Sequence, residues 1–548
     1  MVSSRPRIAG TLAAAAVAGG ATMTVELGAV RLMAPWFGTS AGVWTNVIGV
    51  ILLALALGYL IGAGLAIRPR PLRSLGLVLL ASAALTIWLP FLAEPVCGWF
   101  LPEGLSLHQA AGLWLWGSLA ASLMLFMPSA VLLGCVGPLA VEVVQRGSGA
   151  HAGTAGGQVL CVSTLGSLAG TFATTHLFLP TLGIARTMQV AAAALMLVGV
   201  LVLLASSRGA GRLAPVLLLG LALPGAVFGA HIRQPTLAAG LEVLESAESP
   251  YQSLRVVEDG RWEEPFRMLQ VNEGLDSFQS VWVPTPGLLG PGFYYDYFAL
   301  PAHWDRRAPG TWRTLVLGLG AGTAFRVLRG TAPAERPLDL WGVEIDQEVV
   351  RLGRRYFDLE PDGEDVHVLA GEDARTALRR LPGDFDLVCL DAYANQVEIP
   401  AHLCTAEFFG EITAHLAPGG WIAVNVGGFG PEDPVLEAVG RTLASVLSAP
   451  GDEGPRVVAV RVASSRNWMI FGRKLAACPV PGSPEWGIEG PVGEALMPGL
   501  SLPGAVRIFG AEPRTSASLD AVLTDDHSPM TRLQRLSLEH GREALVRP

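Results

Sequence analysis

The stretch Leu315-Val-Leu-Gly-Leu-Gly-Ala-Gly322 decides the fold of the C-terminal half of the chain. Its first half belongs to an apolar run that predicts a buried strand over residues 314–319. Glycines stand at Gly318, Gly320 and Gly322, where the backbone must turn and lie close to a ligand, which side chains would prevent. A helix is expected next. A strand, a glycine-rich turn and a helix in this order are typical of a nucleotide-binding α/β sheet.

The pattern downstream of this turn repeats the alternation of strand and helix. Upstream, strand-like runs with charged interruptions around residues 254–257 and 267–271 predict a small β-rich region. The alternation predicts a doubly wound parallel sheet, a Rossmann-like α/β fold. The expected strands cover residues 338–345, 366–369, 385–390 and 421–426, and the expected helices cover residues 323–328 and 347–356.

Acidic residues stand at the ends of the next two predicted strands. Glu344 closes the second strand 22 residues after Gly322, which is the spacing of a carboxylate that accepts hydrogen bonds from ribose hydroxyls. Asp373 follows the third strand and is positioned to accept a hydrogen bond from an adenine amino group. Each carboxylate has an alternative role, because either could instead cap the helix that follows it. Together with the glycines they predict a nucleoside site.

The kind of nucleoside follows from what surrounds the glycines. No glycine-rich loop ends in Lys-Ser or Lys-Thr, so a phosphate cradle of that type is not expected. A loop lined by carboxylates repels a pyrophosphate. A cationic sulfonium nucleoside is therefore favoured over NAD.

Charge divides the chain into two parts. Residues 1–233 hold eleven arginines and four glutamates, a net charge of +7, whereas the remainder holds 27 basic and 43 acidic residues, a net charge of −16. The charged fraction of the whole chain, 16%, is low for a soluble protein, for which about 25% is usual. An acidic C-terminal half argues against nucleic acid as a partner. The six cysteines form no CxxC pair and are interpreted as buried apolar residues, and no metal site is expected.

The N-terminal half predicts a multi-spanning membrane domain that contacts the lipid bilayer. Arginines gather before the first span and in the second loop, which places the N-terminus in the cytoplasm. A cleaved signal peptide is not expected, because further spans follow the first at once. The pattern Gly58-Tyr-Leu-Ile-Gly62 indicates close packing between helices. The seven expected spans cover residues 8–30, 43–67, 74–93, 113–143, 157–180, 187–206 and 213–231.

This number of spans conflicts with the site. Seven spans from a cytoplasmic N-terminus would leave the C-terminal half outside, where nucleoside cofactors are scarce. The long fourth stretch and the fifth, rich in Gly, Ser and Thr, are the weakest of the seven. We therefore interpret the count as wrong by one and expect a cytoplasmic C-terminal domain; an extracytoplasmic domain is the alternative.

The order of these motifs resembles the spermidine synthase family, whose Rossmann-like fold is that of S-adenosylmethionine-dependent methyltransferases. The N-terminal half is similar to bacterial proteins in which a multi-spanning domain precedes a spermidine synthase-like domain, which implies the bacterial inner membrane. The stretches that carry the first resemblance are Ser249-Pro-Tyr-Gln-Ser-Leu-Arg-Val256, Leu315-Val-Leu-Gly-Leu-Gly-Ala-Gly322, Gly342-Val-Glu-Ile-Asp346, Gly371-Glu-Asp-Ala-Arg375 and Phe385-Asp-Leu-Val-Cys-Leu-Asp-Ala-Tyr393; the second is carried by residues 26–40 with Val43-Trp44.

The resemblance implies roles for individual residues. The three glycines of the turn would cradle decarboxylated S-adenosylmethionine as co-substrate, Glu344 would hold its ribose and Asp373 its adenine. Gln252 would contact the nucleoside or the amine, and Asp391 would be the catalytic carboxylate, although capping of a helix is its alternative role. The residues expected around the amine substrate are Gln279, Tyr294, Asp296 and Tyr393.

The chain departs from the family pattern where the amine should bind. Ala394 stands where a second aspartate usually grips the far end of the diamine, and Asn395 follows it. The expected Asp-Gly pair is matched only loosely by Glu273-Gly274. Glu398 or Asp296 could replace the lost anchor, or the acceptor could be an amine other than putrescine.

Three functions remain open at this point. The expected activity is aminopropyl transfer from decarboxylated S-adenosylmethionine to putrescine or a related small-molecule amine. The alternatives are an S-adenosylmethionine-dependent methyltransferase and a membrane transporter with a non-catalytic nucleoside-sensing domain. The expected domains are residues 1–235 in the membrane, a β-rich region over 236–312 and a Rossmann-like domain over 313–548. The family also implies a homo-oligomer.

Overall fold

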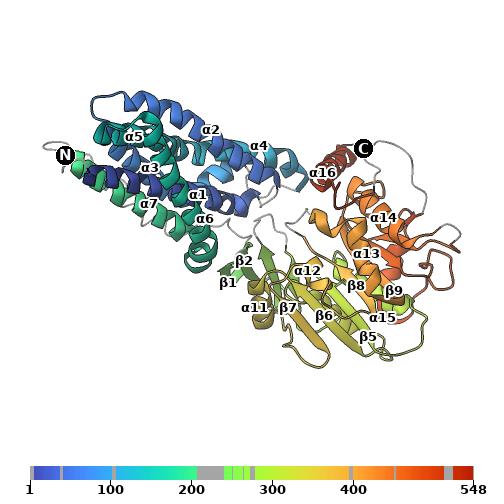
Figure 1. Ribbon diagram of the computed structural model, residues 1–548. Coiled ribbons are helices and arrows are strands. Elements are labelled where there is room, and N and C mark those ends of the chain that lie inside the picture. The colour runs from blue at the N-terminus through green and yellow to red at the C-terminus, as the bar shows by residue number, and fades with distance from the viewer. Residues whose placement is uncertain are drawn as a thin grey trace. The chain divides into compact units, whose positions relative to one another are not determined.

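The computed structural model describes residues 5–37, 41–100, 107–206, 240–249, 251–262, 264–271, 278–393, 399–449, 452–510 and 522–546. The chain divides into two compact units. We call the first the helical unit; it comprises Met1–Thr236 with Glu248–Ser253 and Asn272–Leu275. We call the second the α/β unit; it comprises the rest and includes most of the predicted β-rich region together with the predicted Rossmann-like domain. The predicted fold class, a helical domain followed by an α/β domain, is confirmed (Figure 1).

The described part of the helical unit is a bundle of long apolar helices (Figure 1). Five of the helices in the described residues are long and apolar enough to cross a membrane. These five cover Pro6–Phe37, Gly42–Ala66, Pro71–Phe100, Met127–Ser148 and Thr181–Ser206. The helices of the unit are α1 (Arg5–Phe37), α2 (Ala41–Ala66), α3 (Pro71–Phe100), α4 (Leu107–Leu125), α5 (Met127–Ser148), α6 (Ala152–Ala173) and α7 (Leu179–Ser206), with a π-helical turn over Thr174–Phe178.

The prediction of one span over residues 113–143 was wrong. The helix is interrupted at Phe126, which separates α4 from α5. Pro128 stands in the first turn of α5 and has no N–H to donate to the preceding turn. The predicted fifth span falls on α6 and the π-helical turn, which are not among the five, and the seventh, over residues 213–231, lies outside the described residues.

Glycines bring the helices of this unit close together. A Cβ atom at Gly58 of α2 would lie 2.3 Å from the carbonyl oxygen of Val131 in α5, and one at Gly62 would lie 2.7 Å from the Cα of Cys135. The prediction that these glycines mark close helix packing is confirmed. Of the six cysteines, all of them free, five are buried as predicted, but Cys161 in α6 is exposed, which corrects that interpretation for one position.

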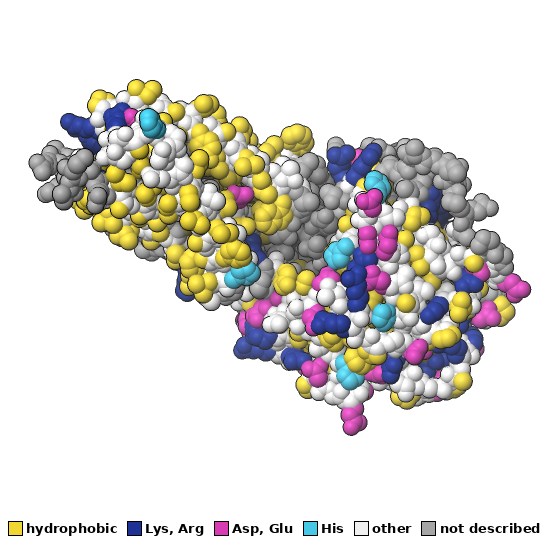
Figure 2. Space-filling view, in the orientation of Figure 1, with side chains coloured by type: hydrophobic (Ala, Val, Ile, Leu, Met, Phe, Trp, Pro, Cys, Tyr) yellow, Lys and Arg dark blue, Asp and Glu magenta, His cyan; other side chains and the backbone are white. Residues whose placement is uncertain are grey.

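The surfaces of the two units differ in composition. Hydrophobic side chains cover most of the face of the helical unit that Figure 2 shows, whereas acidic and basic side chains gather on the α/β unit. The exposed apolar side chains of the helical unit include Leu60, Leu160 and Leu197, each more than half exposed. Apolar exposure on this scale fits a lipid environment better than water.

The α/β unit is built on an eight-stranded mixed sheet in the order β12-β10-β11-β9-β8-β5-β6-β7. Its first five strands in the chain pair in parallel, and β10, β11 and β12 extend it with antiparallel pairs. The strands are β5 (Trp312–Leu317), β6 (Leu338–Glu344), β7 (Val366–Ala370), β8 (Phe385–Leu390), β9 (Leu416–Gly427), β10 (Val457–Arg461), β11 (Asn467–Arg473) and β12 (Val506–Phe509).

Helices cover both faces of this sheet (Figure 1). In β5, Leu315 and Leu317 pack into a core with α12, α13 and α14, whereas Val316 packs into a second core with α10 and α15. Both cores exclude water, which is why the strand is a continuous apolar run rather than an alternating one. The helices are α9 (Leu300–Trp304), α10 (Thr323–Thr331), α11 (Gln347–Tyr356), α12 (Ala374–Leu378), α13 (Ala406–His415), α14 (Pro434–Leu447), α15 (Gly490–Leu500) and α16 (Met530–Val546).

A second, four-stranded sheet precedes the large one, in the order β1-β2-β3-β4. Its last strand, β4, contacts the glycine turn directly: Ser280 accepts a hydrogen bond from the backbone N–H of Ala321, at 2.9 Å. Thr323, the first residue of α10, bonds through its hydroxyl to both backbone groups of Val281. The strands are β1 (Leu241–Glu248), β2 (Ser253–Asp259), β3 (Phe266–Val271) and β4 (Ser280–Trp282).

Candidate active site

The glycine turn links β5 to α10 and needs glycine for two separate reasons. Gly318, Gly320 and Gly322 have φ of 88°, 58° and 99°, values that side chains disfavour. A Cβ at position 318 would also lie 2.5 Å from the backbone carbonyl oxygen of Asp391 at the end of β8. The turn therefore lies directly against the next strand end of the sheet.

Glu344 ends β6 with its carboxylate turned toward the glycine turn. One oxygen accepts a hydrogen bond from the N–H of Gly320 at 2.9 Å, and the other accepts one from Asp346 at 3.0 Å. Burial raises the pKa of Glu344 to about 7. Glu344 does not cap the following helix, which was its alternative role. Asp346 caps α11 instead, because its side chain accepts a hydrogen bond from the N–H of Glu348.

Asp373 follows β7 and does cap a helix. Its Oδ1 accepts hydrogen bonds from the N–H groups of Arg375 and Thr376 in α12, and its Oδ2 lies 3.0 Å from Nε2 of His402. Burial opposes ionisation here, but the hydrogen bond with His402 and the bond from Thr376 hold the pKa of Asp373 below its usual value. The loop stays beside β6, because Gly371 donates its N–H to the carbonyl oxygen of Glu344 at 2.8 Å.

Asp391 lies at the end of β8, between two donors. Its Oδ2 accepts a hydrogen bond from the hydroxyl of Tyr294 at 2.9 Å, and its Oδ1 accepts one from Nδ2 of Asn425 at 2.9 Å. Burial raises the pKa of Asp391 to about 7, and the charge of nearby Glu344 acts in the same direction. The two carboxylates therefore share one region beside the glycine turn.

The sequence prediction missed Asn425 and Asn467. Asn425 lies on β9 and receives a hydrogen bond on its Oδ1 from Nδ2 of Asn467 on β11, at 2.7 Å. Because its carbonyl is occupied in this way, its amide N–H₂ is directed at Asp391. The signal was present in the sequence, since Asn425 is the one polar residue between Trp421 and Val426 in a strand that is otherwise apolar.

The predicted amine-site residues divide into two kinds. Tyr294 reaches Asp391, and its ring stacks on that of Tyr295, with the ring centroids 4.2 Å apart. Burial raises the pKa of Tyr294 well above its usual value, so its hydroxyl keeps its proton and stays a donor. Tyr294 and Tyr295 belong to the 3₁₀ turn Tyr294–Ala299. Gln279 accepts the hydroxyl of Tyr295 on its backbone carbonyl oxygen.

Asp296 and Tyr393 are bonded to backbone. Both oxygens of Asp296 accept N–H groups, from Leu289 and Gly290 at 2.8 Å each, and the residue is 1% exposed. Burial raises its pKa to about 6. The hydroxyl of Tyr393 donates to the carbonyl oxygen of Asn425 and accepts the N–H of Gly427. In this structure Asp296 and Tyr393 bond to backbone groups, and their contacts with the amine stay a prediction.

The remaining predicted residues lie elsewhere or outside the described parts. Gln252 is in the turn between β1 and β2, where its backbone bonds to Ser249, and this segment is grouped with the helical unit. Within the described residues no three His, Cys, Asp or Glu side chains are placed to hold a metal. Glu273, Gly274, Ala394, Asn395 and Glu398 lie outside the described residues.

Two curated proteins are similar in sequence to this chain. A protein of Bifidobacterium longum named "Probable polyamine aminopropyl transferase" is 33% identical over 198 residues, which are 36% of this chain and 40% of that protein. A protein of Streptomyces coelicolor named "Polyamine aminopropyltransferase 2" is 27% identical over 380 residues, which are 63% of each chain. Over these stretches the chain is similar to polyamine aminopropyltransferases. It spans less than two thirds of the length of either relative.

No protein-family model matches this chain. A structure from Corynebacterium glutamicum described as "a probable spermidine synthase" is 21% identical with a TM-score of 0.39, and the match covers 50% of this chain and 91% of that one. Spermidine synthase from Thermotoga maritima is 17% identical with a TM-score of 0.35, covering 48% and 84%.

Proposed function

We propose that this protein transfers the aminopropyl group of decarboxylated S-adenosylmethionine to a primary amine, putrescine or a related one, with Asp391 as the catalytic base. The observation that carries the proposal is Asp391 itself, a buried carboxylate held by Tyr294 and Asn425 beside the glycine turn. The sequence likeness to polyamine aminopropyltransferases supports the same reaction.

The proposed chemistry is a nucleophilic substitution. The amine nitrogen forms a bond to the carbon beside the sulfonium, the carbon–sulfur bond breaks, and the thioether leaves with the electron pair. At neutral pH the amine arrives as an ammonium, which must first give up a proton. Asp391 takes that proton, and its raised pKa of about 7 makes it a stronger base than an ordinary aspartate.

The surroundings of Asp391 suit two cationic substrates. Glu344 and Asp391 are buried carboxylates whose ionised forms are destabilised by lack of solvent. A sulfonium and an ammonium that enter this region supply the missing countercharge, so binding and ionisation favour each other. The donors on Asp391 aim its oxygens, which is the positioning that a proton transfer requires.

The proposed roles of the other residues follow from their places at the strand ends. Glu344 would hold the ribose beside the glycine turn, and Asp373 with His402 would lie at the adenine. The Oδ1 of Asp373 accepts the N–H groups at the start of α12. Its Oδ2, which now bonds to His402, could instead accept a hydrogen bond from a ligand that displaces His402. We propose Gln252 and Gln279 as further substrate contacts. We also propose that residues 1–235, 236–312 and 313–548 are the three domains of the chain.

The proposed setting is the bacterial inner membrane. The five long apolar helices would cross it together with α6, which connects α5 to α7. This even number of crossings agrees with a cavity that is lined by both Arg7, at the start of α1, and Ser206, at the end of α7, so the arginine-rich end would face the cytoplasm and the α/β unit would lie on the same side. A homo-oligomer is part of the proposal. Protease treatment of intact cells and of inverted vesicles tests the sidedness. A cytoplasmic α/β unit is cut in the inverted vesicles and protected in intact cells.

The deciding experiment incubates the full-length protein in detergent with labelled decarboxylated S-adenosylmethionine or labelled intact S-adenosylmethionine and a panel of amines. Products are identified by mass. Transfer of an aminopropyl group supports the proposal. Transfer of a methyl group from the intact nucleoside would assign a methyltransferase instead. Binding of a nucleoside without any product would contradict the proposal and favour a non-catalytic nucleoside-sensing domain.

A further inference from the structure

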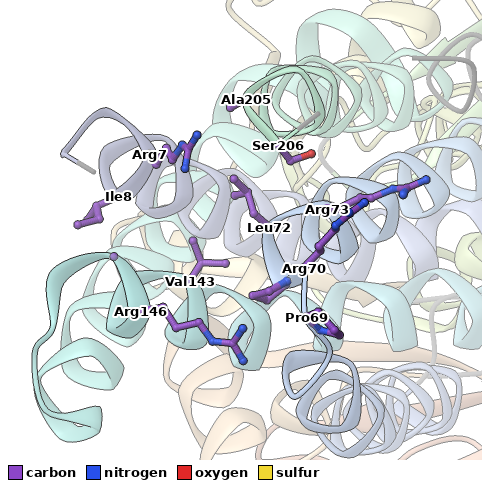
Figure 3. A pocket seen from close by; sticks show the side chains of 12 residues that line it. Arg7, Ile8, Pro69, Arg70, Leu72, Arg73, Val143, Arg146, Ala205 and Ser206 are labelled. Atoms are coloured by element: carbon purple, nitrogen blue, oxygen red, sulfur yellow. The ribbon is translucent and has the colours of Figure 1, made fainter. Parts of the chain in front are cut away.

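A cavity lined by arginines lies at one end of the helical unit, within that unit alone. Its volume is about 500 Å³, and it is bordered by the start of α1, the loop between α2 and α3 with the first turn of α3, and the last turns of α5 and α7 (Figure 3). Four arginines line it, Arg7, Arg70, Arg73 and Arg146. They come from positions up to 139 apart in the sequence, and the bundle brings them together.

Most of this positive charge is not neutralised by the described residues. Arg146 pairs with Glu142 at 2.5 Å and also donates to the carbonyl oxygen of Ala66. In the described parts of the chain, the guanidinium groups of Arg7, Arg70 and Arg73 form no ion pair with an acidic side chain. The last turns of α5 and α7 add partial negative charge at their carbonyls. That amounts to roughly half a charge per helix end, less than the three arginines carry.

The geometry suits a phosphate group in particular. Guanidinium groups bind phosphate oxygens through paired, charge-assisted hydrogen bonds. Beside the arginines, Ile8, Leu72, Val143 and Ala205 give the cavity an apolar side. An anion with an apolar part attached, such as a lipid, satisfies both kinds of lining. Arginine-lined pockets between helices at the cytoplasmic end of a membrane domain are where acidic lipid head groups bind.

We propose that this cavity binds a phosphate group, with the head group of an anionic lipid and free phosphate as the two sources of that chemistry. The site is independent of the proposed transferase activity, because none of its residues belongs to the α/β unit. Occupation would neutralise the arginines and hold the ends of four helices together.

The test compares three forms of the full-length protein in detergent. The first is the wild type and the second is the double variant Arg70→Gln/Arg73→Gln. The third is Arg186→Gln, a matched control that removes an exposed arginine from α7, 20 residues and roughly 30 Å of helix from Ser206. Size-exclusion elution and circular dichroism verify that each variant is folded.

One arm measures binding of phosphatidylglycerol and of phosphatidylcholine by native mass spectrometry. The other measures stabilisation by inorganic phosphate in a thermal shift assay. We expect a preference for phosphatidylglycerol in the wild type and in Arg186→Gln. Affinity should fall about five-fold for each arginine removed in the double variant.

The outcomes separate the two sources. A lost lipid preference in the double variant identifies the lipid head group, and a lost phosphate response without any lipid preference identifies free phosphate; both support the site. The proposal is overturned if the wild type and the double variant behave alike in both arms, or if Arg186→Gln loses as much binding as the double variant.

Discussion

The helical unit and the α/β unit place their charged side chains in opposite ways. In the helical unit, arginines line a cavity at the ends of helices, and few acids accompany them. In the α/β unit, carboxylates gather at the ends of parallel strands, where burial raises the pKa of two of them to about 7. A segment that crosses lipid carries few charges away from its ends, because a charge in the bilayer is costly, whereas a folded sheet can bury charge wherever backbone and side-chain donors receive it.

This contrast predicts that the proposed transfer chemistry depends on the α/β carboxylates and not on the helical unit. The four tests below probe that division, ordered by their expected effect on the rate of transfer.

The largest effect is expected from Asp391→Asn. An amide cannot accept the proton of the ammonium, so the rate should fall by about 10² to 10⁴. Initial rates of product formation measure this effect, while binding of labelled nucleoside should persist. The exposed carboxylate Glu364 provides the control, because Glu364→Gln should keep the full rate. An Asp391→Asn protein with an undiminished rate would exclude this carboxylate as the base.

Gly318→Ala should follow. Its methyl group would meet the carbonyl oxygen of Asp391 at 2.5 Å, in a backbone conformation with φ of 88°. Backbone of this kind costs a residue with a side chain about 1 to 3 kcal/mol. We expect weaker nucleoside binding and a lower midpoint of thermal unfolding. Gly363→Ala is the matched control, because no atom lies within 4 Å of the added Cβ. Equal behaviour of the two variants would contradict a close contact at the glycine turn.

Tyr294→Phe should lower the rate about tenfold, since it removes a hydrogen bond to a charged group. The base works only after it has lost its proton, so kcat/KM should rise with pH through the pKa of Asp391, about 7 in the free protein. The hydrogen bond from Tyr294 lowers that pKa, so its loss should move the rise to higher pH. A profile of kcat/KM from pH 5 to pH 9 measures the displacement.

The control for Tyr294→Phe is Tyr297→Phe, from the same 3₁₀ turn. The hydroxyl of Tyr297 bonds to the N–H of Ala463 and does not reach Asp391. Tyr297→Phe therefore loses a buried hydroxyl of the same kind, but its profile of kcat/KM against pH should stay where it is in the wild type. A displacement of equal size in both variants would show that general loosening, not the contact with Asp391, is the cause.

The smallest effect on transfer is expected from Gly58→Ala. Its Cβ would lie 2.3 Å from the carbonyl oxygen of Val131, so α2 and α5 must separate, at a cost of about 1 to 3 kcal/mol in stability. Gly49→Ala, on the same helix with nothing within 4 Å, is the control and should melt like the wild type. Thermal unfolding in detergent should report the loss, and the rate of transfer at 25 °C should not change. A large loss of rate would break the division between the units.

Much of the α/β sheet could be predicted because its patterns are local. The apolar runs that end at Glu344 and Leu390 were identified to within one residue, as was the helix Gln347–Tyr356. The three strand ends with Glu344, Asp373 and Asp391 converge as expected, since parallel strands present their carboxyl ends at one edge.

What escaped prediction was set by partners far away in the sequence. The contact between Asn425 and Asp391 spans 34 residues, and the contact between Tyr294 and Asp391 spans 97. A lone polar residue in an apolar strand marks Asn425 in the sequence, but no local pattern shows which residue it or Tyr294 contacts. The interruption at Phe126 was missed for a different reason. Hydropathy averages over a window and does not register the single missing N–H of Pro128.

The bond between Ser280 and the glycine turn has a practical consequence for anyone who dissects this protein. A fragment that starts at residue 313, the first position of the predicted Rossmann-like domain, omits the hydroxyl that receives the N–H of Ala321 and the strand to which Thr323 is tied. Its turn would open to water on the side that β4 now covers. Minimal fragments for crystallisation or for grafting onto another anchor should therefore begin before β1 and keep both sheets.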